Sequence, residues 1–133
     1  MAKFTDDQLT SMAQQFHDMA VNVSQFRLDR IHDGAKLDDP GIVQLFGLQF
    51  SLSNTSSSFF LQAAQVTLAN ADKAAAQVTK ATNAANKAIK KLEVINKAVN
   101  IASAAGVLAA SVMSGDLDQI AQSAKGVFDA IQN

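Results

Sequence analysis

The side chains best suited to chemistry in this chain are two histidines and the aspartates beside one of them. Asp29, His32 and Asp33 lie within five residues of one another, so a helix would bring them to one side, where a divalent metal accepts such ligands. No second histidine motif joins them, His17 stands apart, and acidic residues near a helix end usually cap or are solvated. The sequence therefore predicts no metal site and no cofactor.

Catalytic residues are equally scarce. The chain has no Cys, which excludes disulfides, thiolate metal sites and a thiol nucleophile. Its one glutamate, Glu93, lies beside Lys90, Lys91 and Lys97, where an ion pair within one turn explains it. No Gly-rich phosphate loop, G-x-S-x-G or H-E-x-x-H motif occurs. These observations predict a protein that is not an enzyme.

Lysines form the clearest charged feature. The net charge of −1 hides three blocks, with −3 over residues 1–58, +4 over 59–100 and −2 over 101–133. Opposite blocks would complement each other between antiparallel segments or between neighbouring copies. Nucleic acid is an improbable partner, because the pI is near 6.0 and residues 61–127 offer no aromatic ring for base stacking. The middle block would place one basic face on a helix, made of Lys73, Lys80, Lys87, Lys90, Lys91 and Lys97.

The first element that positions these groups is a helix over residues 5–32. Thr5 and Gln8 have the spacing of a capping box, and Gly34 lies where a left-handed residue often ends a helix. Apolar residues recur every three or four positions along one stripe. They are Leu9, Met12, Phe16, Met19, Val23 and Phe26.

Residues 40–58 form an uncharged segment with two possible conformations. Asp39-Pro40 is a good helix start, and Ile42, Leu45 and Phe46 have helical spacing. The alternation from Leu48 to Ser53 instead suits a strand, with the Ser-rich stretch 53–58 as the turn of a hairpin. We favour the helix, with a kink or break at 53–58.

A long Ala-rich helix is expected over about 59–113, because apolar and small residues keep a heptad spacing for six heptads from Leu61. Small residues four apart then line one side of its end and allow another backbone to approach closely. These positions form the predicted helix-contact or oligomer seam. The seam consists of Leu61, Leu68, Val78, Ile89, Leu92, Val99, Ala98, Ala102, Gly106, Ala110 and Ser114.

A last amphipathic helix is expected over 117–132, after a cap at Asp116. No linker is long enough to divide the 133 residues into two domains. The predicted fold is therefore one all-α domain, an elongated helical bundle of three to five helices that includes the long heptad-patterned helix.

The scarcity of charge carries the functional expectation. Residues 40–71 hold no ionised side chain, and neither do 98–115, whereas a soluble helix normally exposes charge. The sequence thus predicts a helical assembly protein that packs on copies of itself or on a helical partner. The alternative is a soluble protein, such as a toxin or pore component, that inserts 40–71 and 98–115 into an anionic membrane. Contacts with membrane or partner would come from Leu45, Phe46, Phe50, Phe59, Phe60 and Leu108. No cleaved signal peptide is visible at the N-terminus, so we expect a protein that is cytoplasmic or exported by a signal-independent route.

Overall fold

The structure is a computed structural model that describes residues 2–133, apart from the side chain of Phe60. Five helices make up almost all of this part of the chain. They are α1 (Asp6–His32), α2 (Pro40–Ala63), α3 (Ala71–Lys91), α4 (Ile95–Ser114) and α5 (Leu117–Gln132). The prediction of one all-α bundle is confirmed.

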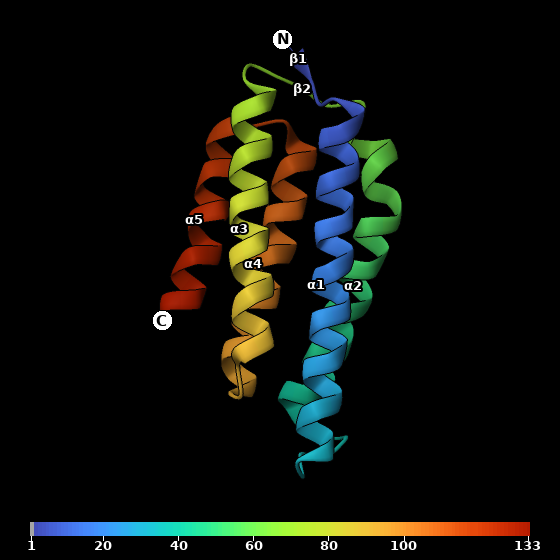
Figure 1. Cartoon of the computed structure of the whole chain (residues 1–133), viewed down its shortest axis with the longest axis vertical. Coiled ribbons are helices and arrows are strands. Elements are labelled where there is room, and N and C mark those ends of the chain that lie inside the picture. The colour runs from blue at the N-terminus through green and yellow to red at the C-terminus, as the bar shows by residue number, and fades with distance from the viewer. Residues whose placement is uncertain (1) are drawn as a thin grey trace.

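The helices alternate in direction and pack side by side around a common core (Figure 1). α1 lies between α2 and α3, α5 packs against α3 and α4, and α4 packs against α2, which closes the ring. α4 therefore contacts every other helix. Two short strands, β1 (Ala2–Lys3) and β2 (Thr67–Leu68), pair antiparallel at the end of the bundle that holds the N-terminus (Figure 1).

The capping residues that the sequence predicts at the starts of α1, α2 and α5 form the expected hydrogen bonds. The Thr5 side chain accepts from the Gln8 amide while the Gln8 side chain accepts from the Thr5 amide, so the capping box at α1 is complete. Asp39 accepts from the amides of Gly41 and Ile42 at the start of α2. Asp116 does the same for Asp118 and Gln119 at the start of α5. Each bond satisfies an amide that the helix itself leaves free.

The helical interpretation of the uncharged segment is confirmed, but the expected break at 53–58 is wrong. α2 continues through the Ser-rich stretch to Ala63. The hydroxyls of Thr55, Ser57 and Ser58 donate to carbonyls four residues earlier, and Ser56 donates to the Ala13 carbonyl of α1. Because these hydroxyls are satisfied without leaving the helical conformation, the serines do not interrupt the helix.

The single long helix over 59–113 is also wrong. The chain leaves the helical path after Ala63 and again between Lys91 and Ile95, so this stretch is the end of α2 followed by α3 and α4. Asn70 caps α3 by accepting from the Lys73 amide. Each turn reverses the chain, and the core is filled by several short helices instead of one long one.

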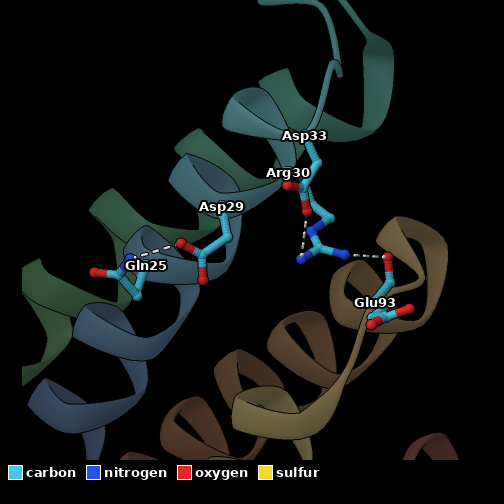
Figure 2. A network of polar contacts seen from close by, with 5 residues as sticks. All are labelled: Gln25, Asp29, Arg30, Asp33 and Glu93. Carbon is cyan, nitrogen blue, oxygen red and sulfur yellow. Dashed lines mark hydrogen bonds and ion pairs between the residues drawn. The ribbon is translucent and has the colours of Figure 1, made fainter.

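The second turn is positioned by contacts from outside the segment. Arg30 of α1 donates from Nη1 to the Glu93 carbonyl at 3.2 Å, and it pairs with Asp33 at 3.1 Å (Figure 2). At the start of α4, Ile95 lies so close to Gly41 that a Cβ at Gly41 would collide with its side chain. α3 thus ends at a turn that is held by both helices of the first hairpin. Arg30 of α1 binds the turn at the Glu93 carbonyl, and Gly41 of α2 packs against Ile95, the first residue of α4.

Candidate interaction surface

The α2 helix carries apolar side chains on two different sides. Its inner side buries Ile42, Leu45, Leu52 and Phe59, each at most 1% exposed, and the Phe59 ring packs on Phe16 of α1 with centroids 5.4 Å apart. Its other side leaves a second set in solvent. We refer to this second set as the outer stripe, which consists of Val43, Phe46, Phe50 and Leu61.

The outer stripe exposes an unusually large amount of apolar side chain for a helix at a protein surface. Its four side chains are between 52% and 72% exposed. Val43, Phe46 and Phe50 follow one another at spacings of three and four, which places them on one face of the helix. Exposed Asn54 and Ser57 lie between Phe50 and Leu61 in the sequence. Because α2 contains no ionised residue, nothing on the helix itself opposes a dry contact with another surface.

The neighbouring edge of α1 extends this surface. Arg27 lies with its guanidinium carbon 4.9 Å from the centroid of the Phe46 ring, and its Nε donates to Gln49 at 3.4 Å. An open hollow of about 240 Å³ runs between the helices and is lined by residues of both, including Val21 and Gln49. Of the nine large apolar side chains that are exposed in the described part of the chain, seven fall between Val21 and Leu61. The helical hairpin α1–α2 therefore presents most of the exposed apolar surface.

Most of the predicted seam lies inside the molecule. Leu68, Val78, Ile89, Val99, Ala98 and Ala102 are at most 8% exposed, while Leu92 and Gly106 are half-buried. Their contacts are made by helices of the same chain, so α4 is covered largely by its own neighbours. These positions were predicted as a helix-contact or oligomer seam, and the helices that they contact belong to the same chain. Three seam positions remain in solvent, namely Leu61, Ala110 and Ser114.

The predicted membrane or partner contacts divide in the same way. Phe46 and Phe50 are exposed, whereas Leu45, Phe59 and Leu108 are fully buried; the side chain of Phe60 lies outside the described residues. Sequence reasoning missed Val43. The signal for it was present, because Val43, Phe46 and Phe50 repeat with helical spacing one position out of phase with the inner set that begins at Ile42.

The basic face is exposed along α3. Lys73, Lys80, Lys87, Lys90 and Lys91 are exposed, and Lys97 at the start of α4 is half-buried. The aspartates considered for metal ligation have other partners, since Asp29 accepts from Gln25 at 2.8 Å and Asp33 pairs with Arg30 (Figure 2). Within residues 2–133, no group of three or more His, Asp or Glu side chains is arranged to hold a metal ion.

In the part of the chain that the structure describes, one helix has the length and composition of a membrane span. It is α4, Ile95–Ser114, and half of its apolar window is buried inside the bundle. The core helix of a soluble bundle has the same character.

The fold and this surface define an all-α five-helix bundle with an exposed apolar helix face. Comparison of the chain with known protein families, curated proteins and solved structures found no match.

Proposed function

We propose that this protein is a non-enzymatic assembly protein that binds a second helix, from another copy or from a helical partner, along the outer stripe of α2. The observation that carries the proposal is the exposure of Phe50 and Phe46, at 63% and 52%, on a helix without any charge. Burying a phenylalanine side chain contributes roughly 1.5–3 kcal/mol, so two such rings supply a useful anchor for binding.

The surroundings of the stripe favour a protein partner of similar composition. Exposed Ser and Asn side chains such as Asn54 and Ser57 can form hydrogen bonds with a facing polar helix at a lower desolvation cost than charges. A charged partner face would lose solvation without finding an opposite charge on α2. A second copy of α2 meets this requirement, because its own outer face is neutral.

The test is the mass in solution of Phe50→Asp, measured by light scattering at micromolar concentration. A charge at the centre of the stripe should remove the part of the assembly that forms through the stripe. At about 500 mM NaCl, where contacts between exposed charges are screened, the variant should have the monomer mass of about 14 kDa. The matched control is Val107→Asp on α4, because Val107 is exposed to a similar degree, 58%, and should leave the mass unchanged. A wild-type protein that is monomeric and soluble without a partner contradicts the proposal.

Membrane insertion is the second candidate function, and the span-like character of α4 favours it. It would require α4 to leave the bundle and expose side chains such as Leu108. Release of a marker from anionic vesicles by wild type, reduced in Val107→Asp, would support insertion, and no release by wild type would contradict it. Substitutions of Leu108 or Phe59 cannot serve in this test, since both side chains are 0% exposed and a charge there would unfold the bundle.

A further inference from the structure

A row of acidic side chains on α1 faces the same side of the molecule as a row of lysines on α3. Asp7, Asp18 and Asp29 recur every eleven residues, which is close to three helical turns, so they lie in line along α1. We refer to them as the acidic row. The basic row on α3 consists of Lys80, Lys87, Lys90 and Lys91, and all members of both rows are exposed.

An open groove separates the two rows. Its larger part, about 450 Å³, is lined by Asp18 on α1, by Lys87 and Lys90 on α3, and by asparagines of both helices. A second part of about 230 Å³ shares Asn22 and Lys90 with the first and reaches Asp29 and Lys91. Aspartates therefore lie on the α1 side of the groove and lysines on the α3 side, while Arg30 and Glu93 line the end of its second part.

The charged groups of the two rows form no ion pairs within the described part of the chain. Over the described residues, the one ion pair within 4 Å joins Arg30 and Asp33. Asp18 and Asp29 accept from the amides of Gln14 and Gln25 on their own helix. No lysine of the basic row lies within that distance of a carboxylate. The two rows are thus free to pair with charges from outside.

The relative height of the two rows follows from the bonds between α1 and α3. The helices run in the same direction, and the hydrogen bonds between them join residues 64 to 71 positions apart. These bonds are Gln8–Asp72, Asn22–Asn86, Thr82–Gln15 and Asn86 to the Gln15 carbonyl. Asp18 is therefore level with a point between residues 82 and 89, in the part of α3 that lies between Lys80 and Lys90. By the same offsets, Asp29 is level with the chain just beyond Lys91, at the end of α3.

We propose that a second copy of this chain docks on the α1–α3 face, related by a two-fold axis parallel to the helices. That operation places α1 of each copy opposite α3 of the other, at equal heights. Asp18 then faces the stretch of the partner's α3 between Lys80 and Lys90, and Asp29 faces the end of that helix at Lys91, with the reciprocal contacts formed by symmetry. This contact deepens the proposed self-association with a second surface, separate from the outer stripe.

The presence of both signs favours a copy over a polyanion. An anionic lipid surface or a nucleic acid lying along the basic row would also approach Asp18 and Asp29 across the groove, and like charges would repel it. A second copy brings lysines to the aspartates and aspartates to the lysines. Because exposed pairs are weak and screened by salt, the contact should depend strongly on ionic strength.

The test is sedimentation of wild type at about 50 mM and about 500 mM NaCl. The contact through the α1–α3 face should weaken at least about tenfold in dissociation constant at the higher salt concentration. The double variant Asp18→Lys/Asp29→Lys, and separately Lys80→Asp/Lys91→Asp, should each lose this salt-dependent association. Circular dichroism verifies that both variants remain folded, which is expected because all four side chains are exposed.

The decisive measurement is the sedimentation of a mixture of the two double variants. One carries a positively charged face and the other a negatively charged face, so the mixture should form a hetero-dimer that neither protein forms alone. The inference is overturned if the mixture does not associate, or if both double variants have the same mass in solution as wild type. Binding of wild-type monomers to anionic vesicles, lost in Lys80→Asp/Lys91→Asp, also overturns it, in favour of a lipid surface.

The outcome is separable from that of the proposed function. Since the inference rests on self-association, Phe50→Asp is measured alongside. If Phe50→Asp dissociates the protein while the charge variants do nothing, the outer stripe stands and this contact fails. If Phe50→Asp keeps a salt-dependent dimer and wild type forms nothing larger, this contact stands and the outer stripe fails.

Discussion

Phe16 and Phe59 meet at the centre of the bundle, where both side chains are fully buried. They join α1 to α2 across the inner side of the first hairpin. Phe46 and Phe50, which are of the same residue type on the same helix as Phe59, are exposed. The difference is one of angular position on the helix, so identical side chains serve the core in one case and a candidate contact in the other.

Phe16→Ala should therefore lower the free energy of unfolding by about 3–5 kcal/mol, because it removes the buried ring and leaves a cavity. Urea denaturation followed by circular dichroism measures this loss. Val21→Ala is the control on the same helix, and since Val21 is 52% exposed its effect should stay within about 0.5 kcal/mol. Equal effects for the two variants would show that Phe16 is not at the core.

At the scale of elements, the connections between helices show what local sequence can specify. The helix starts at Thr5, Asp39 and Asp116 were predictable, since each cap needs only residues within the next turn. The end of α3 near Leu92 was not. No Gly or Pro marks it, and Val94 at the start of α4 makes no side-chain cap. The Arg30 bond to the Glu93 carbonyl comes from 63 residues away.

Substitutions of two glycines compare the end of α4 with the interior of α5. Gly115 ends α4 with φ +71°, and a Cβ there would lie 3.1 Å from Val66 Cγ1 and 3.3 Å from the Thr67 carbonyl oxygen. Gly115→Ala should cost about 1–2 kcal/mol of stability through the left-handed conformation and this crowding. It should be measured by thermal and urea denaturation.

Gly126→Ala is the matched control inside α5. A Cβ at this position meets no atom within 4 Å, so the substitution should stabilise the protein by roughly 0.5–1 kcal/mol. Opposite signs for the two variants are the expected result. A stabilising Gly115→Ala would contradict the left-handed end of α4.

At the scale of the whole molecule, the turns near Asn70 and Leu92 decide the shape. A continuous helix over 59–113 would be about 80 Å long. The five-helix bundle is shorter, because α2, α3 and α4 pack side by side (Figure 1). The heptad pattern alone does not distinguish these arrangements, since apolar seams are buried equally well by a neighbouring chain or by a neighbouring helix of the same chain.

At about 500 mM NaCl, where contacts between exposed charges are screened, the Phe50→Asp variant should have a radius of gyration of about 14–16 Å by X-ray scattering, as expected for a folded domain of this length. A value above about 20 Å would indicate the extended single helix. The measurement uses the variant because self-association of wild type would raise the value on its own.

The sequence alone was enough to establish an all-α domain, its amphipathic first and last helices, and the caps at Thr5, Asp39 and Asp116, because periodicity and capping are local properties. It also identified the stretch without charge that contains the outer stripe. Only the tertiary structure decided that the seam from Leu68 to Ala102 is buried within the chain, and which side of α2 remains exposed. That outcome depends on which helices come to lie next to one another, and contacts between distant residues leave no periodic signal in the sequence.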